Sequence, residues 1–305
     1  MNFVFVFLFF IFSTLTFVGL FLNGFIFLKN IIDWVKGRNL QVVDIIIASQ
    51  SLSRIILLFI YTVQGCMLFS SELLKCIIIY IDYIISAQMF VVNCSLWWGT
   101  VLCVFYCVKI VNCKSRLLTR LKMNISRMVL WQMFGSTVVS FLSSLPYGFC
   151  VYSFHKRNST KMYSRGLENT TLAINSTSFF TISIVVSMIP FIIFCMAIIL
   201  LAAPLFHHIR NMKNKNSGFT KAQLDVTLSA LRNILSFFTF YLIFFISLNV
   251  QPVFFLQYNY DLICLFSICV VAFPSLHSVV LVASNAKLKQ SVIAVLTCSK
   301  SRHVQ

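Results

Sequence analysis

Seven long apolar stretches dominate this chain of 305 residues. A helix rises about 1.5 Å per residue, so about 20 apolar residues in succession cross the hydrocarbon core of a bilayer. A helix also satisfies its own backbone hydrogen bonds in lipid. The sequence therefore predicts an all-α fold, a seven-transmembrane helix bundle that forms a single membrane domain over residues 1–305. The expected spans are Phe3–Leu28, Val42–Gly65, Tyr80–Val108, Met128–Val151, Ser178–Phe206, Asn233–Leu256 and Leu262–Ser284.

Composition and charge agree with a protein whose surface faces the lipid bilayer. Hydrophobic residues make up 59% of the chain and charged residues only 10%, which excludes a soluble globular domain. The formal net charge is +17, but the basic residues lie between apolar stretches and not along one exposed patch. We therefore expect no binding of nucleic acid.

The direction of the spans follows from the charge of the connecting segments. Segments on one side (29–41, 109–127, 207–232 and 287–305) hold 18 Lys and Arg residues, and those on the other side hold five. Since cytoplasmic loops collect Lys and Arg, the N-terminus is expected to be extracellular and the C-terminus cytoplasmic. The segment 152–177 carries three Asn-x-Ser/Thr sequons, which predict glycosylation on the extracellular side at Asn158, Asn169 and Asn175.

One charged residue lies deep inside a predicted span. Arg54 is 12 residues into the second stretch, close to the bilayer centre, where a charge is expensive and should face the bundle interior. Asn23 in the first stretch and Ser278 or Asn285 in the seventh are polar residues at similar depth. We expect Arg54 to hydrogen-bond to members of this group in an interhelical polar network.

The third stretch presents a mixed polar and apolar face at helical spacing. Gln88, Met89 and Val92 lie on this face, which suits either helix packing or contact with an amphipathic small molecule. No catalytic triad, paired carboxylates in the membrane or metal-ligand spacing of His and Cys is present in the sequence. The chain is therefore not expected to be an enzyme, to bind a metal or to need a cofactor.

Several short motifs, taken in order, resemble those of the type 2 taste receptors, the bitter taste receptor family of G protein-coupled receptors. They include LSR at 52–54, FYCVKI at 105–110 and HSVVLVASNAKLK at 277–289. The DRY, CWxP and NPxxY motifs of rhodopsin-like receptors are absent from the sequence, as they are from this family. The sequence departs from the family pattern at Thr227, where the family has a histidine.

This resemblance implies a multi-pass plasma-membrane receptor for small bitter compounds, which bind in a pocket between the outer halves of the helices. No acidic residue lies at the implied pocket positions, so we expect neutral, aromatic or lipophilic agonists. These positions are Gln88, Met89, Val92, Ser183, Phe244, Leu248 and Ser267.

The resemblance also implies coupling to a heterotrimeric G protein of the gustducin-like or inhibitory class. Movement at Phe244 would expose Tyr106, Lys109 and Arg232 to that partner. Assembly into a homo- or hetero-oligomer is left open. The alternatives are a vomeronasal type 1-like pheromone receptor and, more distantly, a small membrane transporter or channel.

Overall fold

The computed structural model describes the backbone of residues 3–38, 41–67, 81–110, 116–160, 168–214, 221–256, 260–284 and 288–292. Side chains are described for most of the positions at membrane depth within these ranges.

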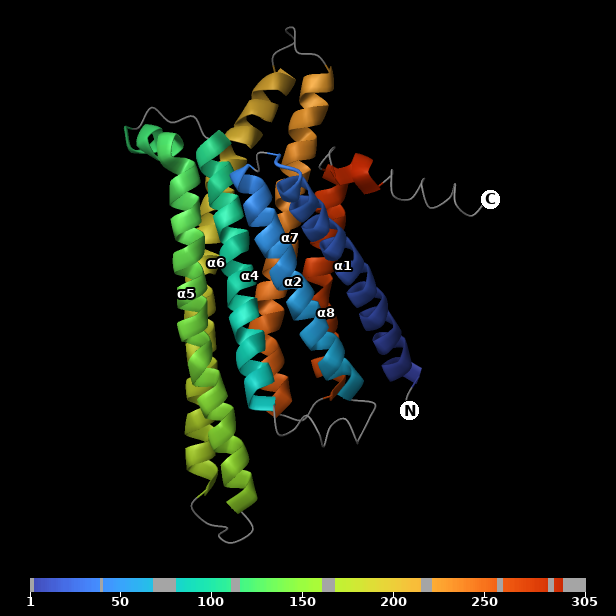
Figure 1. Cartoon of the computed structure of the whole chain (residues 1–305), viewed down its shortest axis with the longest axis vertical. Coiled ribbons are helices and arrows are strands. Elements are labelled where there is room, and N and C mark those ends of the chain that lie inside the picture. Colours follow the sequence, from blue (N-terminus) through green and yellow to red (C-terminus); the bar gives the residue numbers. More distant parts are fainter. Residues whose placement is uncertain are drawn as a thin grey trace.

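Seven helices make up the bundle (Figure 1), each with a segment long and apolar enough to cross a membrane. The predicted all-α, seven-transmembrane fold class is confirmed. The helices are α1 (Phe3–Val35), α2 (Val42–Met67), α4 (Ile81–Ile110), α5 (Arg116–Thr160), α6 (Glu168–Asn214), α7 (Lys221–Leu256) and α8 (Tyr260–Ser284).

Two helices are much longer than the stretches expected from hydropathy. α5 has 45 residues and α6 has 47, whereas about 20 suffice to cross the hydrocarbon core. The apolar segments at membrane depth are 124–146 in α5 and 184–203 in α6. Both helices therefore continue beyond the apolar segment, through residues that hydropathy alone assigns to connections.

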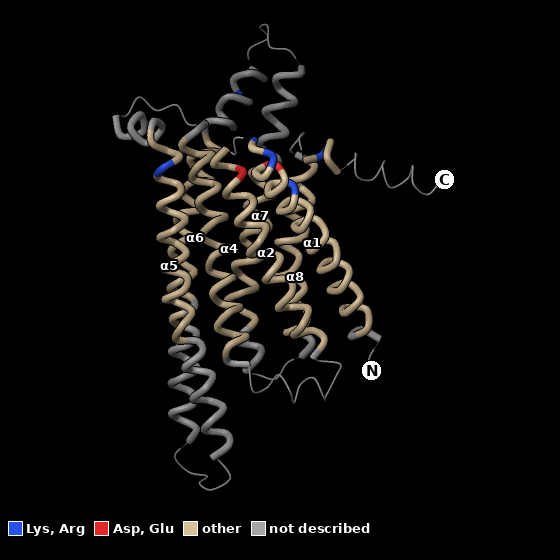
Figure 2. The backbone as a smooth tube through the Cα atoms, in the orientation of Figure 1, with Lys and Arg blue, Asp and Glu red and all other residues tan. Residues whose placement is uncertain are grey.

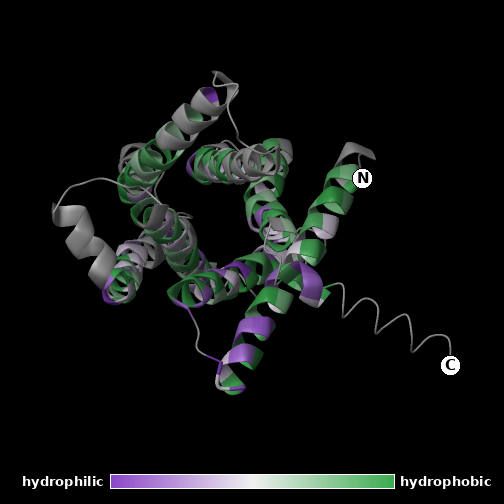
Figure 3. Cartoon of the chain, turned by 90° about the horizontal axis from the view of Figure 1, so that it is seen from above, coloured by the Kyte–Doolittle hydropathy of each residue, from purple (hydrophilic) through white to green (hydrophobic). Residues whose placement is uncertain are grey.

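The helices form a ring in which α4 carries the most buried of the seven apolar segments. α4 packs against α2, α5 and α6, while α8 packs against α7 and α1. Contacts of α1 with α2 and of α6 with α7 complete the ring, and α5 lies outside it against α4 and α6. Figure 3 shows the bundle from above.

Apolar side chains pack inside the bundle and also cover its outer surface. Most of the described helix residues are coloured hydrophobic in Figure 3. The inner set includes Leu58, Leu96 and Phe194, each fully buried between helices. The outer set includes Phe17, Phe59 and Trp131, which are exposed in the isolated chain. Since the spans cross a membrane, these outward-facing side chains contact lipid.

Below, the end of the bundle where α1 begins and α2 ends is called the N-terminal end. The end where α1 and α8 finish is called the C-terminal end. Apart from Arg54, the described Lys, Arg, Asp and Glu residues gather toward the C-terminal end (Figure 2).

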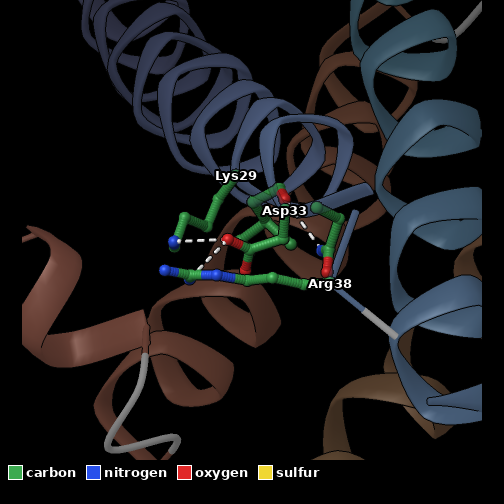
Figure 4. Close-up of polar contacts among 5 residues, drawn as sticks. Lys29, Asp33 and Arg38 are labelled. Carbon is green, nitrogen blue, oxygen red and sulfur yellow. Dashed lines mark hydrogen bonds and ion pairs between the residues drawn. The ribbon is translucent and has the colours of Figure 1, made fainter. Parts of the chain in front are cut away.

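A Schellman motif ends α1 at the C-terminal end. Gly37 has a φ of 69°, and its N–H donates to the carbonyl of Trp34 at 2.9 Å, while the N–H of Arg38 donates to the carbonyl of Asp33 at 3.1 Å. The buried carboxylate of Asp33 also accepts bonds from Lys29 at 3.0 Å and Arg38 at 2.9 Å (Figure 4). These contacts fix the direction in which the chain leaves α1.

The next helix starts with a side-chain cap. The Asp44 carboxylate accepts a bond from the N–H of Gln41 at 3.1 Å, and the Asp44 N–H donates to the Gln41 carbonyl at 2.9 Å. This reciprocal pair satisfies N–H groups that have no partner inside the helix.

Candidate functional site

Polar side chains from four helices meet near the N-terminal end of the bundle. Gln64 on α2 donates from Nε2 to Oε1 of Gln88 on α4 at 2.6 Å. Tyr61, also on α2, donates from Oη to Oε1 of Gln251 on α7 at 3.3 Å. Gln251 Nε2 then donates to Oγ of Ser267 on α8 at 2.7 Å. We call these five residues the polar cluster.

Two members of the polar cluster, Gln88 and Ser267, were among the positions implied by the resemblance. Three other members, namely Tyr61, Gln64 and Gln251, were not predicted as site residues. The sequence does contain a signal for two of them, since Tyr61 and Gln64 are three residues apart and so share a face of a helix near its end.

Three other implied pocket residues lie together in the apolar core. Val92, Phe244 and Leu248 are 4%, 0% and 8% exposed, and all three belong to one cluster of packed side chains from several helices. Met89 is half-buried on α4. A ligand reaching Phe244 would therefore have to separate side chains that are packed against each other in this conformation.

Phe244 is part of an aromatic cluster between α6, α7 and α8. Its ring stacks on Phe273 with centroids 4.7 Å apart, and Tyr241 stacks on Phe194 at 3.9 Å. Aromatic pairs that stack with an offset contribute about 0.5–1.5 kcal/mol per pair beyond simple burial. The cluster thus joins α7 firmly to its two neighbours.

Tyr241 also anchors α7 to α4 by hydrogen bonds. Its hydroxyl donates to the carbonyl of Leu96 at 3.2 Å and lies 3.3 Å from Thr100 Oγ1. Thr100 Oγ1 in turn lies 3.1 Å from the carbonyl of Pro190 on α6. Three helices therefore meet at one buried hydroxyl pair.

Asn23 on α1 and Ser278 on α8 are in direct contact. Ser278 Oγ lies 2.8 Å from Asn23 Oδ1 and 2.6 Å from the carbonyl of Pro274, and Asn23 Nδ2 donates to that same carbonyl at 3.2 Å. All three positions are buried, so these bonds fix the spacing of α1 and α8 in a medium without water.

Arg54 lies in the same layer, but its contacts differ from the expected ones. Its Nη1 lies 2.8 Å from Nδ1 of His277, and its guanidinium carbon is 5.1 Å from the centroid of the Phe273 ring. The expected bonds to Asn23 or Ser278 are absent among the described contacts, because those two side chains bond to each other and to α8. Asn285 lies outside the described residues.

At the C-terminal end, Tyr106 is half-buried and packs edge-on to Phe105 with centroids 5.8 Å apart. It borders an apolar cluster that includes Ile26, Val101 and Val129. The side chains of Lys109 and Arg232, which were expected to act with Tyr106, lie outside the described set.

The side chains of Ser183 and of the sequon residues Asn158, Asn169 and Asn175 also lie outside that set. Within the part of the chain that was searched, no group of three or more His, Cys, Asp or Glu side chains lies close enough to hold a metal ion.

These features define a class of protein: a receptor-type bundle of seven membrane helices, with a polar cluster at one end and a packed aromatic interior. Residues 1–300 match the family model described as taste receptor protein (TAS2R). Taste receptor type 2 member 1 of Pan paniscus is 34% identical over 292 residues, and member 2 of Homo sapiens is 29% identical over 290 residues. Member 8 of Papio hamadryas is 28% identical over 304 residues. Each of these three similarities covers 93% of this chain and 93% of the relative.

The chain therefore belongs to the type 2 taste receptor family. It is a G protein-coupled chemosensory receptor of the bitter taste class and a multi-pass protein of the plasma membrane. Small-molecule ligands and coupling to a G protein follow from the family, whose members are receptors rather than enzymes. The pheromone-receptor and transporter or channel alternatives are not favoured.

Proposed function

We propose that agonists bind at the N-terminal end of the bundle, between the polar cluster and the packed side chains around Phe244. The hydrogen bonds of the polar cluster carry this proposal. One bond links α2 to α4, and two further bonds link α2 to α7 and α7 to α8. A ligand that exchanges bonds with Gln88 or Gln251 can change how those helices meet. It would thereby favour one arrangement of the bundle over another.

The chemistry of the polar cluster favours uncharged agonists. Its members present amides and hydroxyls, and the adjoining surface is made of apolar side chains such as Val92 and Leu248. Pockets for small molecules combine such apolar walls with a few polar groups that orient the ligand. Within the cluster no carboxylate is available to pair with a cationic ligand, so neutral aromatic or lipophilic compounds fit best.

The test is an agonist screen in cells that express the receptor with a promiscuous G protein, followed by dose–response curves for variants. Gln88→Ala and Gln251→Ala should each raise the half-maximal concentration of a neutral agonist about tenfold, as expected when one hydrogen bond worth about 1.4 kcal/mol is lost. Gln132→Ala is the matched control, because Gln132 is a half-buried glutamine on α5, outside the ring. Unchanged potency in both test variants, or agonists that are all cationic, would refute this placement.

Signal transfer would proceed through α7 to the C-terminal end. Displacement of Phe244 would disturb its stacking on Phe273 and the neighbouring contacts of Tyr241. Tyr106, Lys109 and Arg232 would then contact the G protein. We propose a partner of the gustducin-like or inhibitory class.

A panel of G protein activation assays with single α subunits tests this assignment. Phe244→Ala and Tyr106→Ala should lower the maximal response while surface expression is retained. If both variants signal with the potency and efficacy of the original receptor, these two residues do not act in transfer. A response confined to a stimulatory α subunit would exclude the proposed class.

We further propose that the N-terminal end of the bundle is extracellular and the C-terminal end cytoplasmic. The gathering of charge toward the C-terminal end supports this direction, as do the three sequons in the 152–177 segment. An epitope tag placed before Met1 should bind antibody on intact cells. Binding only after permeabilisation would reverse the direction and remove the basis for the proposed ligand site.

A further inference from the structure

Arg54 is the one charged side chain at the depth of the bilayer centre among the side chains the structure describes, and it is only 1% exposed. One edge of its guanidinium is occupied, since Nη1 contacts His277 and the plane lies near the Phe273 ring. The other two nitrogens, Nε and Nη2, have no hydrogen-bond partner within the described structure. Unpaired donors buried in this way are costly in an apolar medium.

The two unpaired nitrogens lie on the same edge of the guanidinium. Their N–H bonds point in nearly parallel directions, and this fork is the arrangement by which arginine binds an anion with two bonds. The contact of Nη1 with His277 leaves both donors of this fork without a hydrogen-bond partner in the described structure. The geometry thus presents two parallel donors, spaced to bind one anion, from a positively charged group.

A third unpaired polar group lies one helical turn away. Gln50 precedes Arg54 by four residues, so both side chains lie on the same face of α2. It is 1% exposed, and neither its amide nitrogen nor its amide oxygen has a partner in the described region. Gln50 Nε2 lies against α4, 3.4 Å from the position a Cβ would take at Gly99, so the amide sits between the two helices.

The charge of Arg54 is not balanced by a carboxylate nearby. Asp33 and Asp44, the acidic side chains described in α1 and α2, are at the C-terminal end of the bundle, where Asp33 pairs with Lys29 and Arg38 and Asp44 caps its helix. His277 accepts from Arg54 through a neutral ring nitrogen, and Phe273 offers only its π face. One full positive charge therefore remains inside the membrane.

We propose that Arg54 and Gln50 form a binding site for a small monovalent anion, with chloride as the physiological ligand. The anion would accept bonds from Arg54 Nε and Nη2 and from Gln50 Nε2. A water molecule could accept two of these bonds but would leave the charge unbalanced, and a buried charge is tolerated only when it is paired. The site lies in the middle of the bundle and is separate from the polar cluster proposed to bind agonists.

The experiment measures thermal unfolding of the purified full-length receptor at constant sodium concentration and ionic strength, with chloride replaced stepwise by gluconate. The unfolding temperature should rise with chloride in a saturable way, by about 2–5 °C when chloride reaches about ten times its dissociation constant. Bromide should substitute for chloride. The ³⁵Cl NMR signal should broaden in the presence of receptor and sharpen again when bromide is added.

Gln50→Glu is the decisive variant, because it places a carboxylate beside the guanidinium with almost no change in shape. In this variant the unfolding temperature should be independent of chloride, and the ³⁵Cl broadening should be lost. Gln132→Glu adds the same charge on α5 and should keep the chloride response of the original receptor. Arg54→Gln removes the cation and should also remove the response.

The proposal is overturned by an unfolding temperature that is equal in chloride and gluconate together with an unbroadened ³⁵Cl signal, since water then fills the site. It is equally overturned if Gln50→Glu keeps the full chloride response. The NMR measurement on the original receptor decides the question even if Arg54→Gln fails to fold.

Discussion

Gly19 lies where α1 is in close contact with α8 and α2, and replacing it by alanine should destabilise the receptor. A Cβ at Gly19 would overlap Ser275 Oγ and lie 2.7 Å from Leu58 Cδ1. Ser275 Oγ is held in place by its bond to the carbonyl of Val271 at 2.8 Å, and Leu58 is fully buried. Neither atom can move away without breaking a bond or disturbing packed neighbours.

The size of the effect follows from two opposing terms. Forcing an extra methyl group into a packed interior costs about 1–3 kcal/mol, whereas alanine is favoured over glycine in a helix by about 1 kcal/mol. The net loss should be about 0–2 kcal/mol, equivalent to a fall of up to about 8 °C in unfolding temperature at 2–4 °C per kcal/mol. Gly24, five residues later in α1, has nothing within 4 Å of the corresponding Cβ position.

The assay is thermal unfolding of purified receptor for Gly19→Ala and Gly24→Ala side by side. Gly24→Ala should be neutral or stabilising, so the two alanines should differ in unfolding temperature with Gly19→Ala lower. Adding Ser275→Ala to Gly19→Ala removes the overlapping oxygen and should recover part of the loss, beyond what the separate effects of the two substitutions predict. Equal stability of the two single variants would refute the argument that α1 and α8 are in close contact at Gly19.

Two further predictions concern buried polar contacts. Tyr241→Phe keeps the ring but removes the hydroxyl that bonds Leu96 and contacts Thr100, so stability should fall by about 0.5–1.5 kcal/mol, as measured by thermal unfolding. Arg38→Ala should cost less than about 1 kcal/mol because the Arg38 side chain is 60% exposed. Asp33→Ala should cost more, since it removes both ion pairs of a buried carboxylate; the opposite order in the same assay would contradict this reasoning.

The sequence allowed the helices to be predicted because hydropathy over about 20 residues is a strong signal. It also singled out Asn23, Arg54 and Ser278, since a polar residue far from the ends of an apolar span stands out on depth alone. The ends of α5 and α6 were missed because, beyond the membrane, residues no longer need to be apolar for a helix to continue. Hydropathy reports on the solvent around a helix, and not on the helix itself.

The partners of these residues were harder to predict. Arg54 contacts His277, the residue directly before Ser278, and a difference of one position on a helix is a rotation of about 100°. Depth says nothing about that rotation. The contact between Tyr61 and Gln251 could not be predicted for the same reason, because it depends on the rotation of α2 and α7 about their axes.

The ring of Phe273 touches both Arg54 and Phe244, so a single side chain belongs to the charged centre and to the aromatic cluster at once. Substitutions on either side of it should therefore combine non-additively, with Phe273 as the shared neighbour. As the receptor diverges, a substitution of Arg54 on α2 should therefore favour compensating substitutions among the aromatic residues of α7. This coupling would act through Phe273 on α8, since α2 and α7 make few direct contacts.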